Sequence, residues 1–300
     1  MITNSFATAR NVTEPAGLIA FAREAAAAAA SYLAEVGGGP VEREYKANAH
    51  DIVTAHDRAC EDRIREVLLA NCPDARIVGE EGGTREGTSA VTFYVDPIDG
   101  TSNFATGNPL YAISIGVAVE DVLVGGVVNA PVLGMEFWAD DTAAYLGTKR
   151  LGPNPERALA DALVLTGFPG LRDLDEDRAF AERERLTLLE SAGAVRNLGS
   201  AALELCFVAA GWADATTLTS INPWDIAAGF YNVEKAGGSI RTWTCSPSDV
   251  DGAEAIPPQE CPAYVACTSE KRYEELDSLL ERVHASRCER SLRNEGAHHE

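Results

Sequence analysis

The chain has 300 residues, of which 46% are hydrophobic, and a formal net charge of −21. Its length and apolar content allow a substantial buried core, while the strong negative charge predicts that it binds neither nucleic acid polymers nor anionic membranes. No apolar run is long enough to cross a bilayer, and seven cysteines without a Cys-x-x-Cys pair or a signal peptide predict reduced thiols and a cytoplasmic location.

The first half of the chain is predicted to combine two helices with a sheet. Residues 1–15 carry no hydrophobic periodicity and are expected to be flexible. Apolar spacing predicts helices over 16–35 and 56–70 and a buried strand that ends at Val95. Apolar runs over 112–119, 122–129, 134–139 and 143–146 alternate with polar breaks, which predicts an antiparallel meander. Residues 16–150 are therefore expected to form an N-terminal α+β half.

The second half, residues 151–285, is predicted to be an α/β unit with a mixed sheet. Strand patterns over 163–166, 239–242 and 264–268 alternate with helix patterns over 176–192, 201–210, 225–236 and 269–285. Residues 286–300 are polar and are expected to form a disordered tail.

The segment Asp96-Pro97-Ile98-Asp99-Gly100-Thr101 is the most informative part of the sequence. It places two carboxylates where a buried strand gives way to a turn. Ligands that are all oxygen suit Mg²⁺, Ca²⁺ or Mn²⁺ and argue against zinc. Residues 101–104 can begin a helix whose free N–H groups would face an anion. The combination suggests metal-assisted phosphoryl chemistry.

Two further segments carry acidic residues in suggestive positions. Glu80 and Glu81 lie in a glycine-rich loop after a short apolar run, and Asp225 lies in the first turn of a helix, where the macrodipole favours negative charge. Taken singly, the loop could be an ordinary solvated surface and Asp225 could be a helix cap.

Together and in this order, the three segments resemble the signature set of the inositol monophosphatase family. The resemblance runs from about residue 16 to about residue 283 and includes Lys46, the segment 51–57 and the pair Gly237-Gly238. It implies a layered α-β-α-β-α sandwich of the α+β class, with the active site between the two halves, and a homodimer. It also implies a Mg²⁺-dependent phosphomonoesterase that hydrolyses a small phosphorylated substrate, an inositol, sugar or polyol phosphate, by attack of an activated water.

The resemblance also implies two or three Mg²⁺ ions in each subunit. One ion would be held by Glu80, Asp96 and the Ile98 carbonyl group. The second would share Asp96 and add Asp99 and Asp225, and a third, weaker ion would lie near Glu80.

The catalytic residues implied by the resemblance are Thr101 and Asp57. Thr101, hydrogen-bonded to Asp57, would orient and deprotonate the attacking water. The phosphate would be bound at Gly100, Thr101 and Ser102, whose N–H groups supply preorganised donors. The implied substrate contacts are Asp99, Gly199, Ser200, Ala201, Leu218 and Asp225. Two simpler interpretations stay open, since Thr101 could only cap its helix and Asp57 could be a surface residue of a highly charged one.

The sequence departs from the inositol phosphatase pattern at Leu218, seven residues before Asp225. Inositol-specific members carry a glutamate there that binds a ring hydroxyl, and losing such a partner typically costs about 1–3 kcal/mol of discrimination. The alternatives are therefore a nucleotide, fructose 1,6-bisphosphate, histidinol phosphate or a specialised-metabolite phosphate, although Ser102 replaces the lysine usual in the histidinol enzymes.

A bisphosphate or nucleotide would call for a basic residue in the pocket. The candidates are Arg172, Arg178, Arg183, Arg185 and Arg196. A last alternative is a metal-binding protein without catalytic activity. The retained nucleophile-activating Thr101 argues against it, because a binder does not need that residue.

Overall fold

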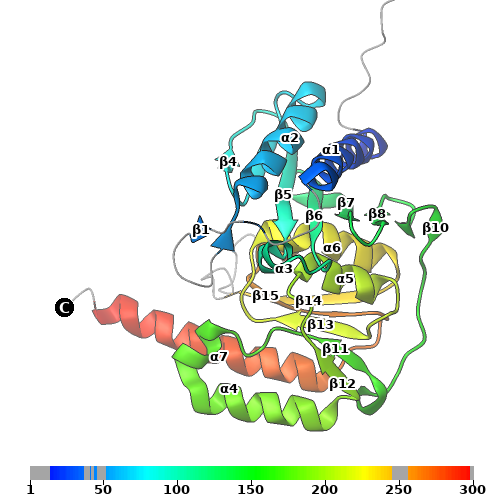
Figure 1. Cartoon of the computed structure of the whole chain (residues 1–300). Helices are drawn as coiled ribbons and strands as arrows, with labels where there is room; N and C mark the ends of the chain where they lie inside the picture. Colours follow the sequence, from blue (N-terminus) through cyan, green and yellow to red (C-terminus); the bar gives the residue numbers. More distant parts are fainter. Residues whose placement is uncertain (1–13, 37–40, 42–43, 46–51, 245–255, 298–300) are drawn as a thin grey trace, which may run out of the picture.

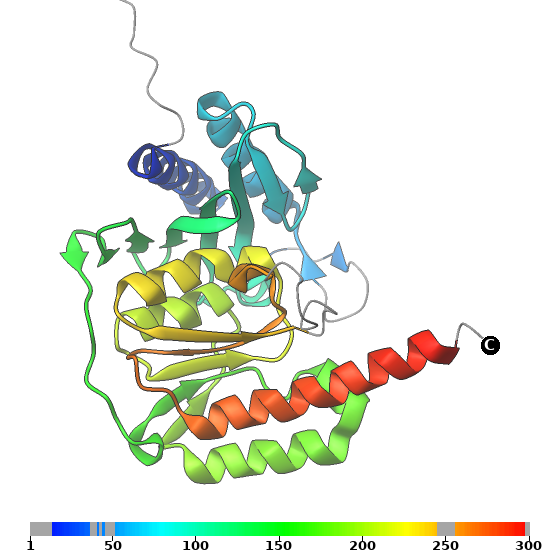
Figure 2. The same ribbon diagram turned by 180° about the vertical axis from the view of Figure 1, so that it is seen from behind.

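Two β-sheets and the helices packed on them form alternating layers across the molecule (Figure 1). The computed structural model describes residues 14–36, 41, 44–45, 52–244 and 256–297. The layers run from a first helix pair through the larger sheet, a second helix pair and the smaller sheet to a third helix pair, as the view from behind also shows (Figure 2). These pairs are α1 (Pro15–Val36) with α2 (Ala55–Asn71), α5 (Ala201–Ala209) with α6 (Pro223–Lys235), and α4 (Leu171–Ser191) with α7 (Glu274–Ala297). The α-β-α-β-α sandwich implied by the sequence is thus confirmed.

The larger sheet has eight strands in the order β10-β9-β8-β7-β6-β5-β3-β4. Neighbouring strands are antiparallel except for the parallel pair β3 and β5, so the antiparallel meander predicted from the apolar runs between 112 and 146 is confirmed. The strands are β3 (Arg76–Gly79), β4 (Gly83–Arg85), β5 (Val91–Asp99), β6 (Ala112–Val119), β7 (Val122–Ala130), β8 (Met135–Ala139), β9 (Ala144–Leu146) and β10 (Lys149–Arg150). A separate small ladder joins β1 (Glu44–Tyr45) to β2 (Ile52–Val53).

The smaller sheet has five strands in the order β12-β11-β13-β15-β14. It is mixed, as predicted, because β11 runs parallel to β12 and β13 while β15 runs antiparallel to β13 and β14. Its strands are β11 (Leu163–Leu165), β12 (Ala194–Arg196), β13 (Ala215–Leu218), β14 (Ser239–Trp243) and β15 (Ala263–Cys267). The short helix α3 (Thr101–Thr106) follows β5 directly, and single 3₁₀ turns lie at Leu159–Asp161 and Pro258–Glu260.

Small residues let helix α6 approach the larger sheet closely. Ala227 and Ala228 on the helix are fully buried and face two glycines on the sheet. A Cβ atom added at Gly126 would lie 2.4 Å from the Ala228 carbonyl oxygen, and one added at Gly116 would lie 2.5 Å from the Ala227 Cβ. Such separations are too short for any side chain. Glycine at both positions therefore allows the short distance between α6 and the larger sheet, which brings the first turn of α6 near the end of β5.

The C-terminal segment differs from the predicted disordered tail, because α7 continues to Ala297. Arg287, which is 9% exposed, donates hydrogen bonds to Asp173, Glu176 and the Thr219 carbonyl group. A polar composition indicated a solvated tail, but Arg287 at its start is paired with Asp173 and Glu176 of α4, of which Asp173 is buried.

The expectation of reduced thiols holds for part of the chain. Among the described residues, Cys60, Cys72, Cys206, Cys261 and Cys267 are buried free thiols, as expected. Cys288 is disulfide-bonded, so the expectation is wrong for that residue. The described helices include none that is both long and apolar enough to cross a membrane.

Candidate active site

An irregular register at the end of β5 orients the two acidic residues of the central segment. Asp96 pairs with Ser114 of β6, whereas Asp99 pairs with Ala112, so β5 carries one extra residue between the two pairs. In a regular strand, residues three apart face opposite sides of the sheet. The extra residue acts as a β-bulge and returns both side chains to one side. The predicted end of this strand at Val95 is therefore wrong, since pairing continues to Asp99.

Asp96, Asp99 and Asp225 form a tight cluster of carboxylates. One oxygen from each lies within 4.8 Å of the others, and Asp96 and Asp99 are buried. Burial raises the pKa of Asp96 well above its usual value, and the charges of Glu80, Asp99 and Asp225 raise it further. Burial, followed by the charge of Asp225, raises the pKa of Asp99 to about 8. An all-oxygen site with strong mutual repulsion fits a hard divalent cation, which would relieve that repulsion.

The N-terminus of helix α5 holds the carboxylate of Asp99. The Ser200 hydroxyl donates to Asp99 Oδ2 at 2.6 Å, and the Ala202 N–H donates to the same oxygen at 2.7 Å. The Ala201 N–H reaches Oδ1 at 3.3 Å. Donors at a helix N-terminus stabilise negative charge. The sequence predicted substrate contacts for Gly199, Ser200 and Ala201, but the polar groups of the latter two already bind Asp99, a role that sequence reasoning missed.

Thr101 and Asp57 lie together although they are far apart in the sequence. The Thr101 hydroxyl is 3.2 Å from Asp57 Oδ1 and 3.2 Å from the Ile98 carbonyl oxygen, so it can donate to either. Asp57 is fully buried rather than a surface residue of α2. Thr54 caps this helix and donates to Asp57 Oδ2 from its N–H at 2.8 Å and its hydroxyl at 2.6 Å. Burial outweighs these hydrogen bonds and raises the pKa of Asp57.

Gly100 makes the turn between β5 and α3 possible. Its φ of 96° lies in the left-handed region that favours glycine. A Cβ atom there would lie 3.1 Å from the carbonyl oxygens of Gly199 and Leu110. Ser102, in the first turn of α3, is exposed. Asn103 of α3 donates to the carbonyl oxygens of Leu110 at 2.6 Å and Leu198 at 2.8 Å, which ties the helix to the segment preceding Ser200.

Glu80 and Asp225 reach the site from two other elements. Glu80 is half-buried at the end of β3, and its N–H donates to the Val95 carbonyl oxygen at 3.2 Å, which places it beside Asp96. Asp225 is half-buried in the first turn of α6, and the Asn222 N–H donates to its Oδ2 at 3.0 Å. The Ser114 hydroxyl donates to the Trp224 carbonyl oxygen at 3.1 Å, which joins this first turn to β6.

Leu218 lies half-buried at the end of β13 and packs against the apolar core between the two sheets. Of the five candidate arginines, Arg172 reaches this region in space, with its Nη1 3.5 Å from Ser220 Oγ. Arg178 and Arg183 pair with neighbouring glutamates, Arg185 donates to the Phe168 carbonyl oxygen, and Arg196 is exposed. Lys46 and Asp51, the first residue of the segment 51–57, lie outside the described residues.

Glu204 is a buried carboxylate that sequence reasoning also missed. Its Oε1 accepts from the Leu198 N–H at 2.9 Å and its Oε2 accepts from the Thr216 hydroxyl at 3.1 Å. It therefore joins the segment that precedes Ser200 to strand β13. The sequence did offer a signal of this role, because Glu204 is the one acidic residue in the apolar helix segment 201–209. A carboxylate buried in such a helix requires hydrogen-bond partners.

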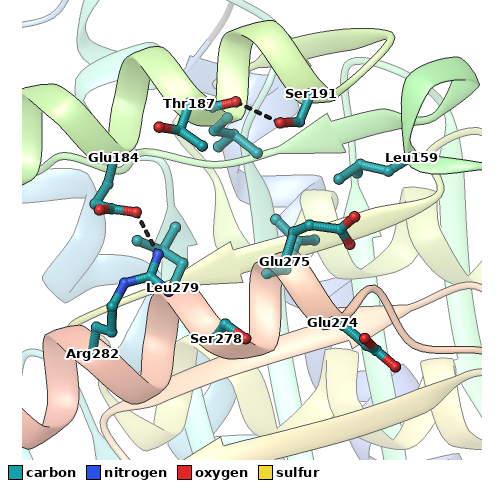
Figure 3. A pocket seen from close by; sticks show the side chains of 11 residues that line it. Leu159, Glu184, Thr187, Ser191, Glu274, Glu275, Ser278, Leu279 and Arg282 are labelled. Atoms are coloured by element: carbon teal, nitrogen blue, oxygen red, sulfur yellow. Dashed lines mark hydrogen bonds and ion pairs between the residues drawn. The ribbon is translucent and has the colours of Figure 1, made fainter.

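A separate cavity of about 380 Å³ lies between α4 and α7 (Figure 3). It is lined by side chains of both helices, among them the ion pair between Glu184 and Arg282. It shares no residue with the carboxylate cluster and contains none of the residues that the sequence selected.

Comparison with known proteins identifies a matching family and similar structures. The model of the inositol monophosphatase family matches residues 14–285. An inositol-1-monophosphatase from Synechocystis sp. is 33% identical over 261 residues, which cover 86% of this chain and 87% of the relative. A fructose-1,6-bisphosphatase/inositol-1-monophosphatase from Aquifex aeolicus is 34% identical over 189 residues, 63% of this chain and 71% of the relative. The crystal structure of the extragenic suppressor protein suhB from Bartonella henselae has a TM-score of 0.74 at 27% identity, with 89% of this chain and 97% of that chain covered.

The layered fold, the clustered carboxylates and these relatives define a phosphoric monoester hydrolase that acts on small phosphate esters. The chain belongs to the inositol monophosphatase family.

Glu204 should make the stability of the fold depend on pH. Burial raises its pKa to about 7 from the usual 4.5, against the hydrogen bonds from Leu198 and Thr216. Between these two values the folded chain holds more protons than the unfolded chain, so the free energy of unfolding should fall as the pH rises. Glu204→Gln cannot titrate and should flatten this part of the curve, as measured by urea unfolding from about pH 3.5 to about pH 8, roughly one unit beyond each value.

The exposed Glu66 of the same protein provides the control. Glu66→Gln should leave the pH dependence of the wild-type protein intact. Parallel curves for wild-type and Glu204→Gln protein would show that Glu204 does not carry this dependence.

Proposed function

We propose that the chain is a Mg²⁺-dependent phosphomonoesterase that hydrolyses an inositol, sugar or polyol phosphate. The observation that carries the proposal is the convergence of Asp96, Asp99 and Asp225 within 4.8 Å of one another, with the Thr101–Asp57 hydrogen bond at the adjoining turn. The ligands would be Glu80, Asp96 and the Ile98 carbonyl group for one ion, and Asp96, Asp99 and Asp225 for a second. Mg²⁺, when bound, supplies Lewis-acid neutralisation of the phosphate and lowers the pKa of water.

The residues around the carboxylates would perform the remaining steps. The N–H groups at Gly100, Thr101 and Ser102 bind the phosphate oxygens and stabilise the charge that develops on them. Thr101 accepts a proton from the attacking water while its own proton passes to Asp57, whose raised pKa makes it a better base. The water oxygen forms a bond to phosphorus, the ester P–O bond breaks, and the leaving oxygen takes a proton from a solvent water beside Asp225, while Asp57 returns its proton to solvent. The products are the alcohol and inorganic phosphate.

A sugar bisphosphate is the second candidate substrate. Leu218 cannot accept a hydrogen bond from an inositol hydroxyl. Ser220 follows Leu218 by two residues, and Arg172 lies near Ser220. The name of the Aquifex aeolicus relative covers both activities. The cytoplasmic location, the homodimer, the third ion and the absence of nucleic acid binding stay predictions from the sequence.

Asp96→Asn should remove the activity. The substitution deletes a charge that both ions would share, so kcat for a generic aryl phosphate with Mg²⁺ should fall by about 10²–10³-fold or more. Release of inorganic phosphate measures it, and Asp62→Asn on the exposed side of α2 is the matched control. An unchanged rate in Asp96→Asn would rule out the proposed mechanism.

Thr101→Ala should separate proton transfer from metal binding. Loss of the hydroxyl should lower kcat by about 10²–10⁴-fold, while the Mg²⁺ concentration that gives half-maximal activity stays nearly constant. Thr101→Ser keeps the hydroxyl and should recover most of the rate. Equal losses of kcat and of Mg²⁺ affinity in Thr101→Ala would instead indicate a purely structural threonine.

Leu218→Glu should shift the choice of substrate. An acceptor at this position should raise kcat/KM for inositol 1-phosphate relative to fructose 1,6-bisphosphate by about tenfold or more. A panel of phosphate esters ranked by kcat/KM measures this, with Leu218→Met as the apolar control. A clear preference of the wild-type enzyme for inositol 1-phosphate would contradict the role assigned to Leu218.

A further inference from the structure

Glu61 of helix α2 is buried against the turn that carries Glu80. It lies in a charged stretch of the sequence, yet it is only 2% exposed. Its Oε2 accepts from the Glu81 N–H at 2.7 Å and its Oε1 accepts from the Gly82 N–H at 3.0 Å. The carboxylate therefore binds two successive N–H groups immediately after Glu80, an arrangement that fixes the path of a turn.

Arg65, one helical turn further along α2, completes this contact. Its Nε donates to Glu61 Oε1 at 2.6 Å, and its Nη2 donates to the Gly83 carbonyl oxygen at 2.6 Å. The guanidinium group neutralises a buried carboxylate that would otherwise be strongly unfavourable. Together, Glu61 and Arg65 hold the backbone of three consecutive residues, 81–83. We call these two side chains the α2 clamp.

The glycines of the turn make room for the α2 clamp. A Cβ atom at Gly79 would lie 2.5 Å from Glu61 Oε1, and one at Gly82 would lie 2.7 Å from the same atom and 2.8 Å from Arg65 Nη2. Any other residue at either position would push the clamp away from the backbone. The glycine-rich composition of this loop thus serves its contact with α2.

The turn and the carboxylate cluster are held by different elements. Glu80 extends the pairing of β3 with β5 and acts on Asp96 through its charge. Asp96, Asp99 and Asp225 are instead brought together by the β5 bulge, by α5 and by the first turn of α6. Movement of the turn would therefore displace Glu80 while the three aspartates keep their positions.

We propose that the α2 clamp sets the affinity of the metal position that Glu80 serves, and acts much less on the position that Asp99 and Asp225 complete. The proposal rests on the proposed function, because it assumes that Glu80 is a metal ligand. Glu61 and Arg65 are then positioning residues that act through the backbone of the turn. Residues that orient metal ligands typically change metal affinity by about 10–100-fold when they are replaced.

Mn²⁺ binding to the full chain, followed by electron paramagnetic resonance of the free ion, tests the proposal. Glu61→Gln places an amide N–H₂ group against N–H donors and should weaken one class of Mn²⁺ sites by about 10–100-fold while the other class changes much less. Glu80→Gln should weaken the same class. The double variant should be no weaker than Glu80→Gln alone, because both changes act on one interaction.

Two further variants keep the outcome unambiguous. Glu66→Gln, which removes an exposed charge from the same helix, should bind Mn²⁺ like the wild-type protein. Arg65→Met keeps the two acceptors of Glu61 but loses the contact with Gly83, and it should weaken the same class of sites if Glu61→Gln does not fold. Equal weakening of both classes, additive losses in the double variant, or unchanged binding in a folded clamp variant would overturn the proposal.

The outcome also separates this proposal from the proposed function. A wild-type protein that binds Mn²⁺ in two classes and hydrolyses phosphate esters, but whose clamp variants bind normally, refutes only the role of Glu61 and Arg65. A wild-type protein that binds no Mn²⁺ refutes both.

Discussion

The structure of the site depends on one extra residue in β5. The bulge between Asp96 and Asp99 brings both carboxylates to the same side of the sheet, and the glycine turn that follows directs the chain toward Asp57. Proline, which has no N–H to contribute to a ladder, lies inside this irregular stretch, where such a residue is tolerated. Without the bulge, Asp99 would face away from Asp96 and from the first turn of α6, and the three aspartates could not share a cation.

The crowded carboxylates are held mainly by neutral donors. Asp99 receives the Ser200 hydroxyl and N–H groups of α5, Asp57 receives two groups of Thr54, and Glu204 receives the Leu198 N–H and the Thr216 hydroxyl. Such donors fix the position of an anion without cancelling its charge. The site therefore keeps a strongly negative local potential, consistent with raised pKa values of Asp96 and Asp99. A divalent cation is the species that this potential favours.

Much of the fold and the central residues of the site could be predicted from the sequence, because they depend on local patterns. Helix α1 and the β6–β9 meander follow from apolar periodicity, and Asp96, Asp99 and Asp225 stand out in short motifs. Contacts between distant segments could not be predicted. Ser200 binds Asp99 across 101 residues, and Glu61 looks like an ordinary surface charge until the packing shows it to be buried. The apolar neighbours of Glu204 indicate burial, but its partners Leu198 and Thr216 follow only from the fold. The C-terminal extension of α7 was missed for the same reason, since Arg287 is paired only through the fold.

The hydrogen bonds that α5 donates to Asp99 have a consequence for the stability of the folded chain. Asp96 and Asp99 come from the first half of the chain, whereas Ser200, Ala202 and Asp225 come from the second. Neither half by itself contains the complete set of ligands and donors, so a cation at the three aspartates recognises only the docked arrangement. Its binding free energy would then add to the stability of the whole molecule in proportion to RT ln(1 + [L]/Kd). A higher cation concentration would thereby reduce how often the chain unfolds.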